Sequence, residues 1–323
     1  MRKEIISRAV YVLLFALSDT PEAQSQAARI GILGPGEEPR FSEVAAGLKE
    51  GLRGHGHSQQ SLEILEERVA RGDPAGARAA AEKLIRQDAK VLFVIGSELA
   101  KTARQVSSEI PVVFITPGDP VAAGLVSSLA HPGGNMTAMT FEYPELAGKR
   151  LELLKEMLPK LRRVVVLYDS RDASPKQGVS AARESAPRLG LALIERETRR
   201  QEEVTAALDV LAEGDALLAI PGGVTTGYYR EMIRAANAKR LATMFHARSA
   251  GTMDALATYG ANDAEIARQA ARLVDKILKG AKAGELPVER PSRLEFTVNL
   301  KTAKTIGVTI PPTVLARADK VLK

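Results

Sequence analysis

The sequence contains no cysteine and no tryptophan, and aromatic residues make up only 4% of its 323 residues. Without cysteine the chain can form no disulfide, use no thiol in catalysis and carry no lipid-anchored cysteine. The absence of tryptophan argues against the mode of sugar recognition in which indole rings stack on the ligand. Thiol enzymes, lipoproteins and sugar receptors of that type are therefore not expected.

The sequence also lacks the motifs of nucleotide-binding and nucleophilic enzymes. The glycines of Gly31–Gly36 do not have dinucleotide spacing, no Walker A loop is present, and no serine occupies a nucleophile elbow. His55 and His57 lie in a glycine-rich turn without nearby carboxylates, and His131 precedes a Pro-Gly-Gly loop. No nucleophile–base pair can be assigned. We therefore expect no cofactor, no metal site and no enzymatic activity.

Charge does not point to a nucleic-acid partner. The formal net charge is +6, and the basic residues are spread along the chain without a basic block. Hydrophobic residues make up 45% of the chain and charged residues 26%, which are ordinary values for a globular protein. A chain of this length can form two domains, each with its own core.

The N-terminus has the pattern of a secretory signal peptide. Basic residues at positions 2 and 3 precede nine apolar residues, Ala9–Leu17, and small residues at 25 and 27 suit cleavage after Ala27. The apolar run is too short to span a bilayer as a helix. A buried amphipathic helix is the alternative, but Arg8 and the polar run 18–26 disfavour it. Together with the absence of cysteine, a cleaved signal predicts a soluble protein of the bacterial periplasm.

After the predicted signal, apolar segments of strand length alternate with segments of helical periodicity. This alternation predicts parallel sheets with helices between the strands. Because the pattern restarts after Phe141, it favours two similar lobes divided near residue 140. The expected strands cover 29–33, 91–95, 112–116, 164–168, 191–194, 216–220, 242–245, 255–259 and 294–298. A further strand is expected around Leu62 and Ile64, reaching Val69 at most.

Small or hydroxyl-bearing residues follow several of these strands, at Gly96–Glu98, Thr116–Asp119, Asp169–Ser170 and Pro221–Gly223. In a parallel sheet such strand ends meet at one edge. Free N–H groups at the following helix starts can hold a carboxylate, and hydroxyl groups can orient it. Each loop alone is compatible with an ordinary tight turn, but four of them in two facing lobes predict a ligand-binding cleft. His246 ends another strand that we expect to face this cleft.

Four segments resemble the periplasmic substrate-binding proteins of ABC transporters, in the subfamily similar to tryptophan- and tyrosine-binding receptors. The resemblance extends over nearly everything after Arg29, and the Gly-Asp-Pro block and the C-terminal tail are its most specific parts. The segments are GDPVAAGLVSSLAHPGGNMTAM, PELAGKRLELLKEMLPKL, FHARSAGTMDALATYGAN and FTVNLKTAKTIGVTIPPTVLARADKVL.

The resemblance implies an α/β fold of two Rossmann-like lobes with parallel sheets, joined by a three-stranded hinge, the type I periplasmic binding protein fold. The crossings between the lobes are then expected near 138–142, 247–255 and 284–293. The implied domains are a signal peptide (1–27), an N-terminal lobe (28–139 plus 252–286) and a C-terminal lobe (140–251 plus 287–323).

The resemblance also implies a function. The protein would be a monomeric solute receptor that closes two lobes over a small polar solute with a carboxylate, such as an amino acid, and delivers it to the permease subunits of an ABC importer. The strand ends and the resemblance together give the candidate ligand-binding residues, which are Gly34, Pro35, Ser97, Glu98, Thr116, Gly118, Asp119, Asp169, Ser170, Pro221, Gly222 and His246.

The sequence departs from the family pattern in two places, after its first strand at Pro35–Glu38 and at Gly222–Thr226. These departures leave the identity of the solute open. The alternative function is a two-lobe α/β enzyme, such as a racemase or a hydrolase, acting on a small polar substrate. A regulator that has lost its DNA-binding domain fits poorly, because the chain starts with an export signal.

If the signal peptide is cleaved where the small residues predict, the mature protein begins at Ala28. N-terminal sequencing of the secreted protein would check this. A secreted form that retains Met1 would contradict it.

Overall fold

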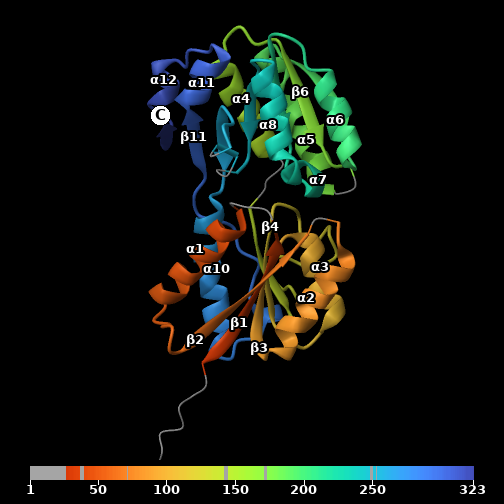
Figure 1. Cartoon of the computed structure of the whole chain (residues 1–323), viewed down its shortest axis with the longest axis vertical. Helices are drawn as coiled ribbons and strands as arrows, with labels where there is room; N and C mark the ends of the chain where they lie inside the picture. Colours follow the sequence, from red (N-terminus) through yellow and green to blue (C-terminus); the bar gives the residue numbers. More distant parts are fainter. Residues whose placement is uncertain are drawn as a thin grey trace, which may run out of the picture.

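The computed structural model describes residues 27–36, 40–70, 72–141, 145–170, 173–247, 250–251 and 253–323. These residues form two α/β lobes stacked along the long axis of the molecule (Figure 1). One lobe is built on a five-stranded sheet and the other on a seven-stranded sheet. The expectation of two α/β lobes with parallel sheets is thereby confirmed, with one antiparallel exception. The predicted signal sequence, up to residue 26, lies outside the described residues.

The sheet of the first lobe is entirely parallel, with the strand order β2-β1-β3-β4-β5. Its central strands are almost continuous runs of buried aliphatic and aromatic residues, as expected for strands covered on both faces. The strands are β1 (Ala28–Pro35), β2 (Leu62–Val69), β3 (Ala89–Ile95), β4 (Val112–Thr116) and β5 (Met136–Thr140).

Helices cover both faces of this sheet. Along β1, Ile30 and Ile32 join the core beneath α1 and α10, whereas Leu33 joins the core beneath α2 and α3. The alternation follows from the two-residue period of a strand. The helices are α1 (Arg40–Gly54), α2 (Pro74–Arg86), α3 (Ser97–Val106) and α10 (Asp263–Leu278).

The sheet of the second lobe has the strand order β12-β11-β10-β9-β8-β6-β7. All its neighbouring pairs are parallel except β10 and β11, which are antiparallel. The exception arises because β11 enters from the other lobe, at the edge where the remaining strands end. The strands are β6 (Arg163–Tyr168), β7 (Ala192–Glu197), β8 (Asp215–Ala219), β9 (Ala242–Phe245), β10 (Ala257–Gly260), β11 (Glu295–Asn299) and β12 (Lys320–Leu322).

The helices of the second lobe also divide between two faces. Residues of α4, α5, α11 and α12 share one core cluster, and residues of α6, α7 and α8 share the other. The bounds are α4 (Glu145–Met157), α5 (Ala173–Ser185), α6 (Gln201–Asp209), α7 (Gly223–Gly227), α8 (Tyr229–Ala238), α11 (Leu300–Ile306) and α12 (Pro312–Leu315), with short 3-10 helices η1 (Pro187–Leu189) and η2 (Ala283–Glu285).

The chain passes between the lobes between β5 and α4, between β10 and α10, and between η2 and β11. Two of these crossings are hydrogen-bonded to each other. The Glu289 N–H donates to the Ala138 carbonyl and the Thr140 N–H donates to the Glu289 carbonyl, both at 2.9 Å. Paired crossing strands permit bending of the lobes but restrain their sliding.

One predicted boundary is wrong. Residues 252–260 were assigned to the first lobe, with a crossing near 247–255, but β10 lies in the seven-stranded sheet, where Thr258 pairs with Phe245 of β9. The chain turns back after β9, adds β10 to the same sheet, and crosses only after Gly260. The pattern of 255–259 predicts a strand, and β10 confirms it, but the pattern does not indicate which sheet the strand joins.

Two glycines of α1 allow it to approach α10 very closely. A Cβ atom at Gly47 would lie 2.1 Å from the carbonyl oxygen of Ala264, and one at Gly51 would lie 2.4 Å from the carbonyl oxygen of Arg268. Since no Cβ atom can come so close to a carbonyl oxygen, a side chain at either position would force the helices apart. Gly54, near the end of the same helix, has no atom within 4 Å of the corresponding point.

Replacing Gly47 by alanine should therefore destabilise the protein by about 1–3 kcal/mol, the usual cost of overpacking. The matched control is Gly54→Ala, which meets no neighbour and should be neutral or stabilising by up to about 1 kcal/mol, because alanine favours helix more than glycine. Urea denaturation of both variants would measure the difference. Equal stability of the two variants would show that the close contact of α1 and α10 is not a constraint.

Candidate ligand-binding cleft

A cleft with a volume of about 1100 Å³ lies between the two lobes. Its walls are the segments that follow the strands of both sheets. In the first lobe these segments follow β1, β2, β3 and β4, and in the second they follow β6, β7, β8 and β9. Parallel α/β sheets bind ligands at this edge, so the geometry places the candidate site where the chain leaves the strands.

Most of the predicted ligand-binding residues line this cleft. They come from both lobes and include residues of three of the four strand-end loops named from the sequence. The predicted residues that line the cleft are Pro35, Ser97, Glu98, Gly118, Asp119, Pro221, Gly222 and His246.

Thr116 and Gly34 do not line the cleft but support its wall. Thr116 is fully buried, and its hydroxyl lies 2.6 Å from the Ser97 hydroxyl and accepts the Gly118 N–H at 3.0 Å. Gly34 is a packing position, since a Cβ atom there would lie 2.7 Å from the Phe41 ring. Neither residue is among those that face the cleft, so we place both behind it.

Asp169 and Ser170 also lie behind the cleft wall. Asp169 is fully buried, and its carboxylate accepts the N–H of Val224 at 3.2 Å, which fixes the start of α7. The Ser170 hydroxyl accepts a hydrogen bond from Arg199 Nε at 3.0 Å. These two residues therefore hold α7 and Arg199, which do line the cleft.

The start of α3 is shaped by Gly96. This glycine has φ of 103°, a conformation that side-chain-bearing residues rarely adopt, and no side chain caps the helix there. The first N–H groups of α3 are thus available beside the Ser97 hydroxyl at the cleft wall. The arrangement suits a polar ligand group with hydrogen-bond acceptors.

Asp119 has a local structural role as well. Its carboxylate accepts the N–H groups of Val121 at 2.8 Å and Ala122 at 3.3 Å, which closes the turn after β4. A side chain engaged in this way can still face the cleft, but its replacement would disturb the turn. Ser97 is therefore the cleaner position for testing ligand contact.

Sequence reasoning missed several charged residues of the lining. Arg199 and Arg200 follow β7, so the strand-end rule applied to that strand would have found them. Arg40 is the first residue of α1, and no sequence pattern identified it as a residue of the cleft. The charges near β7 and α3 are largely paired, as in Arg200–Glu203 at 3.2 Å and Lys101–Glu98 at 2.8 Å.

His246 occupies the hinge side of the cleft. Its side chain is only 2% exposed, and its ring stacks on Phe141, directly after β5, with the ring centres 6.1 Å apart. Its Nδ1 is hydrogen-bonded to the Tyr229 hydroxyl, whereas its Nε2 is buried and has no hydrogen-bond partner in the described part of the chain. Burial, reinforced by the nearby positive charges of Arg150 and Arg40, holds the pKa of His246 well below its ordinary value. The ring is therefore neutral at physiological pH.

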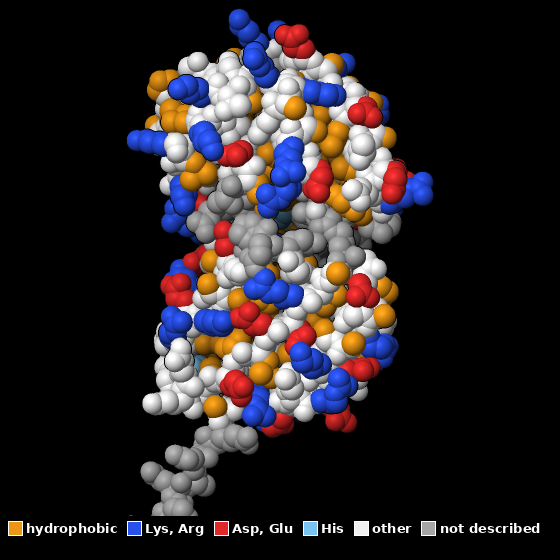
Figure 2. Space-filling model, viewed as in Figure 1, with side chains coloured by type: hydrophobic (Ala, Val, Ile, Leu, Met, Phe, Trp, Pro, Cys, Tyr) orange, Lys and Arg blue, Asp and Glu red, His pale blue; other side chains and the backbone are white. Residues whose placement is uncertain are grey.

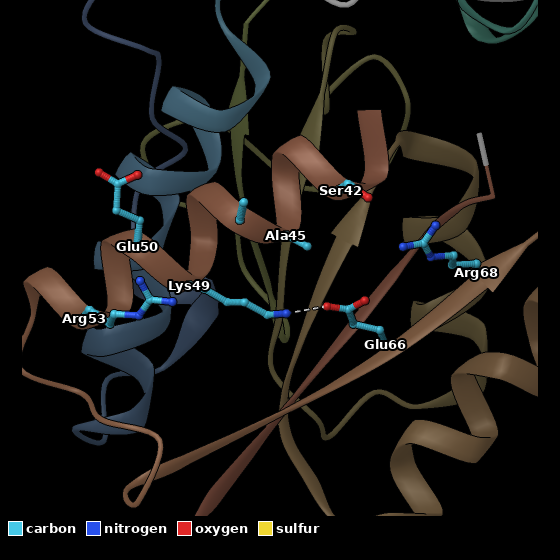
Figure 3. Close-up of a pocket in the computed structure, with 8 residues that line it drawn as sticks. Ser42, Ala45, Lys49, Glu50, Arg53, Glu66 and Arg68 are labelled. Atoms are coloured by element: carbon cyan, nitrogen blue, oxygen red, sulfur yellow. Dashed lines mark hydrogen bonds and ion pairs between the residues drawn. The ribbon is translucent and has the colours of Figure 1, made fainter. Parts of the chain in front are cut away.

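A second hollow, of about 570 Å³, lies on the outer side of the first lobe between α1 and β2 (Figure 3). Lys49 of α1 reaches across it to Glu66 of β2 at 2.6 Å. The Arg68 guanidinium lies 4.3 Å from the centre of the Phe41 ring. The hollow is bounded by one lobe only and is bridged by its own ion pair, so it is a weaker candidate than the cleft.

Among the described residues there is no group of three or more histidines and acidic residues that could hold a metal ion. His57, which the sequence places in a glycine-rich turn without nearby carboxylates, has its Nε2 hydrogen-bonded to Asp275 Oδ1 at 2.8 Å. No helix in the described ranges has the length and apolar character needed to cross a membrane. In the space-filling view, basic and acidic side chains alternate over both lobes rather than gathering by sign (Figure 2).

Comparison with known proteins identifies the family. Residues 29–322 match the family described as ABC transporter substrate binding protein. The chain belongs to this family, and the function expected from its resemblance, a solute-binding receptor of an ABC transporter, is confirmed.

Three relatives illustrate the similarity. A tyrosine-binding protein of Clostridioides difficile (strain R20291) is 24% identical over 280 residues, covering 86% of this chain and 81% of its own. A conserved domain protein of Vibrio cholerae O1 biovar El Tor is 29% identical, with a TM-score of 0.80 and coverage of 91% of this chain and 99% of its own. The ABC domain from Streptococcus pneumoniae in complex with L-Trp is 23% identical, with a TM-score of 0.80 and coverage of 92% and 100%. The last similarity establishes the type I periplasmic binding fold.

The depressed pKa of His246 predicts a loss of stability in acid. The unfolded chain takes up a proton at this residue near pH 6.5, whereas the folded protein resists protonation, so lower pH favours unfolding. Below about pH 6.5 the wild type should lose up to about 1.4 kcal/mol per pH unit relative to His246→Phe. Denaturation at pH 7.5, 6.5 and 5.5 would measure both slopes. Parallel curves would mean that the folded ring protonates as easily as the unfolded one.

Proposed function

We propose that the protein is the periplasmic receptor of an ABC importer for a small amino acid-like solute that carries a carboxylate. The observation that carries the proposal is the cleft of about 1100 Å³ whose walls come from strand ends of both lobes. A solute that contacts both walls interacts fully only with the closed form, so it shifts the population toward closure. The closed receptor then delivers the solute to the permease subunits, acting as a monomer.

The chemistry of the cleft supports a carboxylate-bearing solute. Arg40 brings a positive charge to the first-lobe wall, and the uncapped start of α3 offers N–H groups beside Ser97 for a further polar group of the solute. Two relatives point the same way, since one is named a tyrosine-binding protein and another was solved with L-Trp. The departures at Gly222–Thr226 and after β1 mean that the solute of this chain need not be either of these.

The secretory signal peptide predicted from the sequence supports the periplasmic location. A catalytic role is less well supported than binding. The hydroxyl partner of Ser97 is Thr116, not a base, so Ser97 is not activated as a nucleophile. A turnover assay on the amino acids that bind would separate a receptor from a racemase or hydrolase.

A thermal-shift screen with the twenty L-amino acids tests the proposed ligand class. A cleft ligand at 100 times its Kd should stabilise the protein by about 2.7 kcal/mol. Monosaccharides and divalent cations are screened alongside as ligands of other chemical classes. Stabilisation by these alone would overturn the amino-acid assignment.

Ser97→Ala should weaken binding of the amino acid found in this screen by roughly 1.5–3 kcal/mol, the cost of one hydrogen bond to a charged group. Stability should change little, because Thr116 keeps its bond from the Gly118 N–H. Calorimetric titration would measure the affinity, with Thr205→Ala, an exposed substitution on α6, as control. Normal binding by Ser97→Ala would place the ligand away from α3.

A further inference from the structure

Two buried nitrogen atoms at the hinge side of the cleft lack partners. Nε2 of His246 and Nη2 of Arg40 are both inaccessible to solvent and have no hydrogen-bond partner within the described ranges, although both residues line the cleft. Arg40 keeps a contact from Nε to Asp263 Oδ1 at 3.4 Å, which leaves Nη2 for another acceptor. Buried polar groups of folded proteins are rarely left unsatisfied, so an acceptor supplied by a ligand is the natural partner.

The two nitrogens lie on opposite lobes but on the same side of the cleft. Arg40 begins α1 and contacts Asp263 at the start of α10, immediately after the second crossing. His246 ends β9 and stacks on Phe141, immediately after β5 and the first crossing. Both therefore lie at the hinge end, whereas Arg199 and Arg200 follow β7, the strand at the far edge of the second sheet.

His246 contacts the Tyr229 hydroxyl through Nδ1. We assign the Tyr229 hydroxyl as the donor to Nδ1, and a neutral imidazole that accepts at Nδ1 carries its hydrogen on Nε2. Nε2–H is then a donor. With Arg40 Nη2, the hinge end presents donors from both lobes to whatever occupies it.

The charges around this end favour an anionic acceptor. Arg40 and Arg150 are the two charged groups whose fields act on His246, and both are positive. The charges near β7 and α3 are paired with acidic neighbours, such as Glu203 and Glu98, and at the hinge end Arg40 contacts Asp263. A carboxylate at the hinge end would meet donors and positive charge together.

We propose that the carboxylate of the bound solute lies at the hinge end of the cleft, where His246 Nε2–H and Arg40 Nη2 donate to its oxygens. The inference rests on the proposed function. It identifies the carboxylate as the part of the solute that bridges the two lobes and so favours closure. Because one donor belongs to each lobe, the carboxylate is fully coordinated only when the lobes are together. Ser97 and the α3 start then contact another polar part of the solute.

The consequence is a preference for acids over amides. A carboxamide carries no charge and turns an N–H₂ donor toward one of the two protein donors, so it should bind at least tenfold more weakly than the acid. Loss of either protein donor should reduce this ratio. Loss of a contact elsewhere in the cleft should lower the affinity for acid and amide together and leave the ratio unchanged.

The experiment compares each L-amino acid that stabilises the wild type with its carboxamide, using calorimetric titration. The variants are His246→Phe, which keeps the ring beside Phe141, Arg40→Lys, which keeps a charge for Asp263, and Tyr229→Phe, which removes only the hydroxyl. Ser97→Ala is the matched control. We expect the acid-to-amide ratio to fall toward one in His246→Phe, to fall in Arg40→Lys and Tyr229→Phe, and to persist in Ser97→Ala.

The possible failures are distinguishable. If no L-amino acid binds the wild type, the proposed function fails and the inference fails with it. If an amino acid binds but the wild type does not prefer it to its amide, or if His246→Phe and Arg40→Lys keep the wild-type ratio, the carboxylate lies elsewhere. In that case the inference is overturned while the receptor function stands. Circular dichroism of each variant confirms that the fold is retained, and Tyr229→Phe provides a test even if His246→Phe does not fold.

Discussion

The backbone-to-backbone contact of α10 with α1 is the constraint on which the rest of the structure depends. α10 is separated from the first lobe in sequence by most of the second lobe, yet it completes the core beneath β1, with Ile266 and Leu273 beside Ile30 and Ile32. The chain must therefore leave the first lobe after β5, return after β10 and leave again after η2. The same constraint that completes a core thus produces a hinge with three strands.

The hinge in turn decides which residues meet in the cleft. Because the start of α1 contacts the start of α10 and β9 lies beside β10, Arg40 and His246 both lie near the second crossing, where their free nitrogens are excluded from solvent. Exclusion of water makes an unpaired donor costly and a matching acceptor correspondingly favourable. The strands farther from the hinge, such as β7, bring residues to the opposite side, where solvated ion pairs contribute little.

The sequence predicted the elements well because local patterns determine them. Strands such as β3 and β4 are unbroken apolar runs between turn residues, and the strand-end rule identified loops that do line the cleft. Prediction from the sequence failed where a strand's sheet or a residue's burial depends on partners distant in the sequence. The sheet that β10 joins is decided by pairing with β9, and the burial of Asp169 is decided by α7, a short helix that the sequence pattern did not predict.

The residues at the hinge end were accessible to sequence reasoning only in part. His246 was named because it ends a strand, but nothing local reveals that Tyr229 occupies Nδ1 and leaves Nε2 without a partner. Arg40 carries no motif at all, and its role follows from α10 fixing its Nε through Asp263. In both cases one nitrogen of the side chain holds the group within its own lobe, through Arg40 Nε or His246 Nδ1, and a second nitrogen, Nη2 or Nε2, has no partner in the described part of the chain. This division orients the donors before a solute arrives, so less of the binding free energy is lost in ordering them.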